Sequence, residues 1–130
     1  SGYTAYTGHS DARDVRTLQA EGNYDADLVL RLQEKRIVDY ISSYYGYMGG
    51  CDVLVFTAGI GEKSPECRLH VCQRIKEALQ IEIDESLNAI KGEELEISTP
   101  NSKVKVLVVP TNEELMIARD CIRIGKLELE

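Results

Sequence analysis

The chain has 130 residues, of which 43% are hydrophobic and 28% are charged, and its formal net charge is −7. This length and composition predict one globular domain with its own core. The acidic balance argues against nucleic acid and anionic membrane as partners, because both favour a basic surface.

No run of residues is long and apolar enough to cross a membrane, and no basic, apolar leader stands at the start, so a cytoplasmic protein is expected. The sequence begins without methionine, and we expect it to be a piece of a longer protein. The cysteines form no C-x-x-C pair, which favours reduced thiols over a zinc or disulfide site. They are Cys51, Cys67, Cys72 and Cys121.

Two helices are predicted in the first third of the chain. An irregular start over 1–8 leads to a short helix over about 10–20, whose first residues are the polar ones that favour a helix start. Gly22-Asn23 interrupts the pattern. A longer helix over about 24–45 follows, with apolar residues at every third or fourth position, and glycines within 46–50 are expected to end it.

The stretch Asp52–Glu66 predicts a buried strand, a glycine turn and a helix start. Val53–Phe56 is an unbroken apolar run, as expected for a strand covered on both faces. Gly59 and Gly61 permit positive φ and a close approach of a ligand to the backbone. Ser64-Pro65 suits an N-cap and the first helical position, and the free N–H groups of such a helix start attract anions such as phosphate.

Taken alone, this glycine turn is as consistent with a purely structural turn as with a binding loop. It lacks the third glycine of the dinucleotide fingerprint and the Gly-Lys-Ser/Thr ending of a Walker A loop. The residues by themselves leave both readings open.

The second half of the chain continues the alternation of helix and strand. We expect a helix from Pro65 to about Leu79, a polar surface loop over 84–94 and a second buried strand over 104–109, which Pro110 ends. The minor elements are a possible edge strand over 81–84, a brief strand over 95–98, a turn over 99–102 and a last helix that opens with the capping-box spacing of Thr111 and Glu114.

This order of elements predicts an α/β fold with a parallel strand pair joined by a right-handed crossover. In open α/β sheets ligands bind at the carboxyl ends of the strands. The glycine turn and the segment Thr111–Glu114 should therefore face one crevice. A nucleotide could be held there by an acidic chain, through backbone amides and a magnesium ion bridging its phosphates to a carboxylate.

Three motifs resemble the C-terminal part of the acetate kinase family (acetate, propionate and butyrate kinases), whose members are actin-like, ribonuclease H-like ATPases. They are Ser10-Asp11-Ala12-Arg13-Asp14, Phe56-Thr57-Ala58-Gly59-Ile60-Gly61-Glu62 and Val109-Pro110-Thr111-Asn112-Glu113-Glu114-Leu115. The resemblance covers nearly all of the chain, and it corresponds to roughly the last third of a full family member. It implies that residues 1–130 form one C-terminal nucleotide-binding portion.

The resemblance also implies roles for particular residues. It places Asp11, Ala12 and Arg13 at the adenine and ribose pocket, and it makes Glu113 the carboxylate that helps hold Mg²⁺. It places a loop against the adenosine and phosphates that consists of Gly59, Ile60, Gly61, Glu62 and Lys63. Cys67 and Arg68, one turn into the next helix, are weaker candidates for lining this pocket.

Each assignment has a structural alternative: Asp11 as a helix cap, Arg13 in a surface ion pair and Glu113 as a favourable charge at a helix N-terminus. Two positions depart from the family pattern. Lys63 stands where the family usually has asparagine, although a lysine can reach phosphate as a point charge. Ala12 is smaller than the usual middle residue of the Asp-x-Arg motif, which implies a thinner wall of the adenine pocket.

The resemblance implies a kinase that passes the γ-phosphate of ATP to acetate or another short carboxylate, giving acyl phosphate and ADP, with Mg²⁺ and as a homodimer. The family's substrate-binding and catalytic residues lie upstream of this segment, so no catalytic residue is assigned here and the isolated chain is expected to be inactive. The alternative is a non-catalytic module that packs on a partner. Within the family, propionate or butyrate kinase is the alternative.

Overall fold

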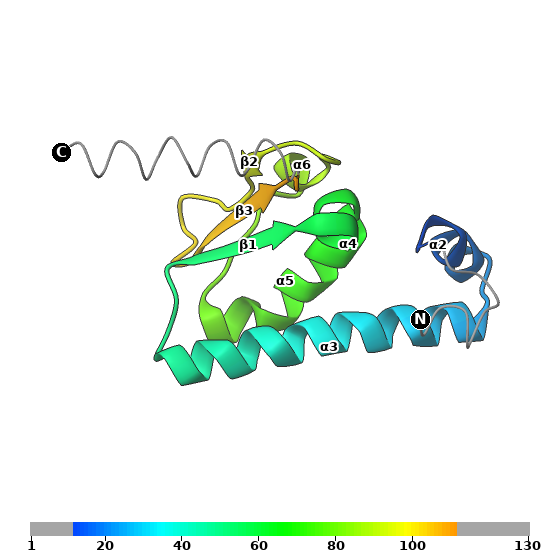
Figure 1. The fold of residues 1–130 in the computed structure, drawn as a ribbon, viewed down its shortest axis with the longest axis horizontal. Coiled ribbons are helices and arrows are strands. Elements are labelled where there is room, and N and C mark those ends of the chain that lie inside the picture. Colours follow the sequence, from blue (N-terminus) through cyan, green and yellow to red (C-terminus); the bar gives the residue numbers. More distant parts are fainter. Residues whose placement is uncertain (1–11, 112–130) are drawn as a thin grey trace.

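The computed structural model describes residues 12–111 of the chain (Figure 1). The helices are α2 (Ala12–Ala20), α3 (Tyr24–Met48), α4 (Ala58–Lys63), α5 (Pro65–Leu79) and α6 (Glu85–Asn88), and the strands are β1 (Val53–Thr57), β2 (Leu95–Glu96) and β3 (Lys105–Val109). Among these residues, no helix is both long enough and apolar enough to span a membrane.

The strands form one mixed sheet in the order β1-β3-β2. β1 and β3 run parallel, with Val53 opposite Lys105 and Thr57 opposite Val109, so the predicted parallel pair is confirmed. β2 runs antiparallel to β3, on its other side. The α/β class is therefore correct, and the third strand makes the sheet mixed.

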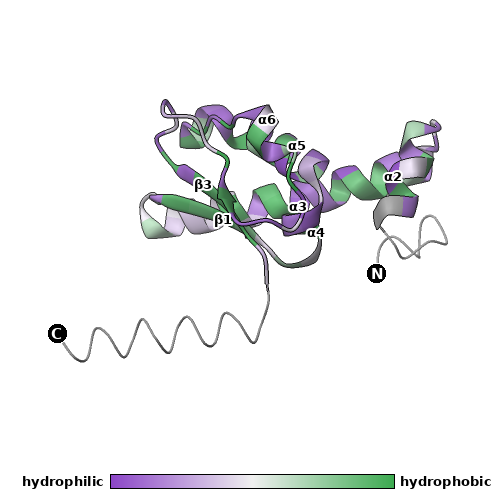
Figure 2. Ribbon diagram, turned by 90° about the horizontal axis from the view of Figure 1, so that it is seen from above, coloured by the Kyte–Doolittle hydropathy of each residue, from purple (hydrophilic) through white to green (hydrophobic). Residues whose placement is uncertain are grey.

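The core lies between one face of this sheet and α5, with α3 packed along α5 on the far side (Figure 1). β1 and β3 are largely hydrophobic along their length (Figure 2). Alternation within β3 sends Val106 and Val108 into the core, where they join Phe56 from β1 and the apolar stripe of α5. The stripe consists of Cys67, Val71, Cys72, Ile75 and Leu79, which recur at helical spacing.

One face of β1 is open, which corrects the prediction of a strand covered on both faces. Val53 and Val55 are 44% and 46% exposed, whereas Phe56 on the opposite face is buried. Among the described residues β1 is also an edge strand, because only β3 pairs with it. The apolar run therefore predicted the strand correctly but predicted too much burial. β-branched residues are common in strands whether or not both faces are covered.

Local sequence signals set most helix limits as predicted. The side chain of Asn23 accepts a hydrogen bond from the Ala26 N–H at 2.9 Å and caps α3. Gly49, at φ 75°, ends that helix, whereas Gly46 lies inside it. The Oγ of Ser64 accepts from the Cys67 N–H at 3.2 Å, and Pro65 is the first residue of α5, as expected for this pair.

The predictions between α5 and β3 were less accurate. The predicted loop over 84–94 contains α6, because Asp84 caps it by accepting from the backbone of Ser86 and Leu87. The predicted edge strand over 81–84 is reduced to a single bridge between Ile83 and Ser98. The predicted last helix lies outside the described residues.

Candidate functional site

The carboxyl ends of β1 and β3 lie side by side, as the parallel register requires. Thr57 is opposite Val109, so the segment that follows β1 and the segment that follows β3 leave the sheet at one level. The two turns predicted to share a crevice therefore start at the same edge of the sheet. This edge, with the residues that follow each strand, is called the carboxyl edge below.

The turn after β1 is strained. Ala58 has φ 56°, in the left-handed region that a residue with a Cβ rarely adopts, and Gly59 follows at φ 41° and ψ −113°. α4 is therefore a short, kinked helical segment rather than the open glycine turn that the sequence predicted. Strain of this kind is concentrated at functional sites, because only the surrounding structure can maintain it.

Gly59 and Gly61 differ in whether their backbone conformation requires glycine. Gly59 needs the freedom of a residue without a Cβ, and a Cβ built there would meet no described atom within 4 Å. Gly61 has no left-handed φ, and a Cβ there would lie 3.6 Å from the backbone carbon of Phe56, an ordinary contact. Gly59 is thus the residue of this turn whose φ favours glycine and beside which the described residues leave open space.

Glu62 joins the two turns of the carboxyl edge. Its side chain is buried, and its Oε2 accepts a hydrogen bond from the backbone N–H of Thr111 at 2.6 Å, with the Thr111 hydroxyl 3.4 Å away. Its backbone carbonyl accepts from the Gly92 N–H at 3.1 Å. The sequence treated Glu62 as one member of a loop and did not predict these contacts, since no local pattern links residues 49 positions apart.

Arg68 lies inside the protein and supports the turn from behind. Its side chain is fully buried, and its guanidinium donates to the Gly61 carbonyl at 3.1 Å, to Asn88 Oδ1 at 2.8 Å and to the carbonyls of Asn88 and Ile90 at 2.7 and 2.6 Å. Burial lowers the pKa of this guanidinium. Arg68 and the equally buried Cys67 do not line an open pocket, so that expectation was wrong.

The buried thiols should be unreactive in the folded protein. Burial raises the pKa of Cys67 to about 11, with Glu34 adding to the shift, and burial raises the pKa of Cys72 to about 12. A raised pKa means less thiolate, roughly 0.1% or less at pH 8, and the thiolate is the reactive form. We expect iodoacetamide at pH 8 to label both at least about a hundredfold more slowly than in urea, by peptide mass spectrometry.

Half-buried Cys51 is the internal control for this labelling experiment. Burial, followed by the nearby Asp52, also raises its pKa, but access to solvent should still make it the fastest of the three thiols. Labelling of Cys67 or Cys72 as fast as Cys51 in the folded protein would contradict the burial of these thiols in the core.

The remaining predicted site residues are placed only in part. Lys63 is exposed at the end of α4, and Ile60 is partly buried against the core. Ala12 and Arg13 begin α2, which lies beyond the carboxyl end of β1 (Figure 1). Asp11 and Glu113 lie outside the described residues.

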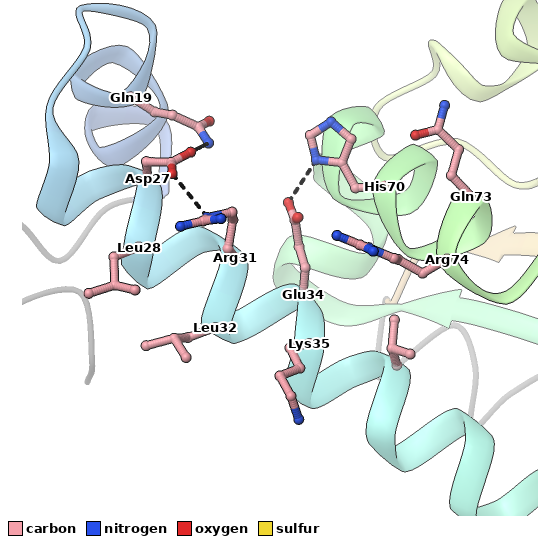
Figure 3. Close-up of a pocket in the computed structure, with 11 residues that line it drawn as sticks. Gln19, Asp27, Leu28, Arg31, Leu32, Glu34, Lys35, His70, Gln73 and Arg74 are labelled. Atoms are coloured by element: carbon pink, nitrogen blue, oxygen red, sulfur yellow. Dashed lines mark hydrogen bonds and ion pairs between the residues drawn. The ribbon is translucent and has the colours of Figure 1, made fainter.

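A carboxylate on α3 connects α2 to the rest of the molecule. Oε1 of Glu34 accepts a hydrogen bond from Arg16 of α2 at 2.8 Å and lies 3.0 Å from Nδ1 of His70 on α5. Figure 3 shows Glu34 and His70 facing each other from the two helices. Through Arg16 and His70, this carboxylate links α2 and α5 across α3.

A hollow of about 910 Å³ lies elsewhere, between α2, α3 and α5 (Figure 3). None of the predicted site residues lines it, and it is bordered by charges of both signs, such as Asp27 and Arg31, which pair at 3.0 Å. We therefore do not take this hollow as the candidate site. The strained turn after β1, which contains predicted site residues, is the better candidate.

The described part of the chain contains no group of three His, Cys, Asp or Glu side chains that could hold a metal ion. The predicted metal ligand, Glu113, is two residues beyond Thr111 in sequence. A carboxylate is the hard oxygen ligand that Mg²⁺ prefers, and Mg²⁺ usually takes only one or two of them. The donor chemistry of this segment therefore suits Mg²⁺.

The fold places this chain among α/β proteins that can bind ligands at the carboxyl edge of parallel strands. The sequence model of the Acetokinase family matches residues 1–119. The chain belongs to the acetokinase family.

Relatives and solved structures agree with this assignment. The curated acetate kinase of Dictyoglomus thermophilum is 51% identical in sequence over 88% of this chain. That of Acholeplasma laidlawii is 50% identical over 95% of this chain. The crystal structure of Porphyromonas gingivalis acetate kinase aligns with a TM-score of 0.85 at 42% identity over 95% of the chain and 31% of that protein. A propionate kinase from Francisella tularensis aligns at 0.78, with 36% identity, over 91% of the chain and 30% of that protein.

The match is partial from the side of the relatives. The chain spans 29% of the Dictyoglomus thermophilum acetate kinase and 31% of the Acholeplasma laidlawii protein. The family model therefore includes all of the described residues. The chain itself corresponds to less than a third of the length of each of these two relatives.

Proposed function

We propose that this chain is the nucleotide-binding portion of a kinase that transfers the γ-phosphate of ATP to a short carboxylate, giving acyl phosphate and ADP. The observation that carries the proposal is the strained Ala58-Gly59 backbone at the carboxyl edge, next to the exit of β3, in a chain of the acetokinase family. An open backbone at that edge suits a ligand that binds through main-chain groups.

In this proposal the residues of the turn position the nucleotide. Gly59 allows the adenosine and phosphates to approach the backbone, Ile60 offers an apolar contact for the base, and exposed Lys63 is free to approach phosphate as a point charge. Asp11, Ala12 and Arg13 are the proposed residues that border the adenine and ribose. Phosphoryl transfer depends mainly on such positioning and on charge stabilisation.

Glu113 is the proposed residue that would hold Mg²⁺, and the ion would neutralise the negative charge that develops on the phosphates. The chain's own contribution is to hold that carboxylate at the same edge as the glycine turn. The contact between Glu62 and Thr111, two residues before Glu113, supports this placement.

We further propose that the chain is the C-terminal portion of a cytoplasmic, homodimeric enzyme whose carboxylate-binding and catalytic residues lie in upstream sequence. Both acetate and propionate kinases are among the similar proteins. Acetate is the proposed substrate, because the curated relatives cited above carry the name acetate kinase.

The second candidate is a non-catalytic module that packs on a partner. The open face of β1, with Val53 and Val55 nearly half exposed, favours it, because such an apolar face gains stability when covered. This candidate predicts weak nucleotide binding or none.

Two measurements on the isolated 130 residues separate these functions. We expect no acetyl phosphate from ATP and acetate, since the residues for the second substrate are upstream, but a rise in melting temperature as Mg-ATP is added. A ligand that binds only the folded state stabilises it by mass action, about 2.7 kcal/mol at a hundred times its dissociation constant.

A flat melting temperature in Mg-ATP would favour the non-catalytic module. Acetyl phosphate formed by the isolated chain would contradict the division of labour that we propose. Full-length protein, assayed in parallel, should form acetyl phosphate and serves as the positive control.

A further inference from the structure

The two residues at the end of α4 differ in direction. Lys63 is exposed, whereas Glu62 is only 7% exposed and its side chain reaches inward to the segment after β3. There its Oε2 accepts a hydrogen bond from the Thr111 backbone N–H at 2.6 Å. A buried carboxylate that is bonded to the protein in this way is poorly placed to contact a nucleotide.

The same turn is also held from the other side. The Glu62 carbonyl accepts from the Gly92 N–H at 3.1 Å, and the Gly61 carbonyl accepts from Arg68 at 3.1 Å. The end of α4 is thus held through its backbone carbonyls, one bonded to the Gly92 N–H and the other to the Arg68 side chain. The Glu62 carboxylate is therefore not needed to hold α4, and it can position the segment after β3 through its bond to Thr111.

We propose that Glu62 is a positioning residue that couples the glycine turn to the segment carrying the metal-binding carboxylate. The inference rests on the proposed function and refines it. Thr111 is followed directly by Asn112 and Glu113, so the bond to Glu62 fixes the start of that segment against the turn that receives the nucleotide. Glu62 would thereby influence where a Mg²⁺ ion held by Glu113 meets the nucleotide, without touching either.

A carboxylate is well suited to this task. It accepts from the Thr111 N–H and faces the Thr111 hydroxyl, and a hydrogen bond to a charged acceptor is stronger than one to a neutral acceptor. Glutamine keeps the length and one acceptor oxygen but loses the charge. Alanine removes the contact altogether. Glu62→Ala should therefore weaken the coupling more than Glu62→Gln does.

The experiment measures ATP affinity of the full-length protein by calorimetry, with Mg²⁺ and with EDTA. We expect Glu62→Ala to weaken Mg-ATP binding by about tenfold, within the usual range for coupled sites, and Glu62→Gln by about threefold. Affinity for ATP in EDTA should change by less than about twofold in both variants, because Glu62 does not contact the nucleotide. Glu93→Gln, an exposed acid on the neighbouring loop, is the charge-matched control and should match wild type.

The other outcomes overturn the inference in distinguishable ways. Equal losses with Mg²⁺ and with EDTA would make Glu62 a direct nucleotide contact. Lower melting temperatures with unchanged affinities in both conditions would make it a residue of the fold alone. Failure of the wild-type protein to bind ATP at all would instead overturn the proposed function, and this coupling with it.

Discussion

Gly59→Val in the full-length protein is expected to raise the KM for ATP by about tenfold or more and to leave the KM for the carboxylate within about twofold. Gly59 has φ 41° and ψ −113°, a conformation that a β-branched residue reaches only with strain of roughly 1–3 kcal/mol. The protein can relieve that strain only by moving the turn, and about 1.4 kcal/mol corresponds to tenfold in binding.

Two control variants separate an effect on the nucleotide site from a general effect of backbone strain. Gly49→Val places the same side chain at another left-handed glycine, φ 75°, at the end of α3, so it should cost stability without changing the KM for ATP. Gly61→Ala should be mild, because the added Cβ makes only ordinary contacts. Equal increases in KM for ATP and for the carboxylate in Gly59→Val would count against a nucleotide site at this turn.

Arg68→Ala should destabilise the protein strongly. It leaves four acceptors without a donor: Asn88 Oδ1 and the carbonyls of Gly61, Asn88 and Ile90. Buried unsatisfied polar groups each cost about 1–3 kcal/mol, so a total of about 3 kcal/mol or more is expected after partial relaxation. The melting temperature of the full-length protein should fall by about 5 °C or more.

The geometry of the guanidinium matters as much as its charge. Arg68→Lys keeps the charge but cannot reach acceptors in several directions, so it should recover only a small part of the loss. Arg74→Ala, on the exposed side of the same helix, is the matched control and should shift the melting temperature by less than about 1 °C. A small effect of Arg68→Ala would mean that water replaces the arginine.

Features encoded by neighbouring residues could be predicted from the sequence. The Ser64-Pro65 helix start, the Asn23 boundary between two helices and the strand that ends at Pro110 all depend on contacts within a few positions. The parallel pairing of β1 with β3 followed from the alternation of elements, because strands separated by a helix usually run in the same direction.

Features encoded by distant residues could not be predicted. Ala58 carries no signal of its left-handed backbone, since alanine normally favours helix, and the surrounding packing imposes that conformation. The family resemblance assigned Glu62 to the nucleotide loop and Arg68 to the lining of its pocket, whereas their burial depends on partners at Thr111, Asn88 and Ile90. The roles of Asp11, Arg13 and Glu113 stay predictions drawn from the family resemblance.

The open valine face of β1 has a practical consequence for handling the polypeptide. Among residues 12–111 only β3 pairs with β1, and a strand with an unpaired edge and apolar side chains on one surface is a template for adding strands from other molecules. The isolated 130 residues should therefore tend to precipitate as protein concentration rises. Charged substitutions at Val53 and Val55, outside the buried core, offer the simplest way to keep the chain dispersed for the measurements above.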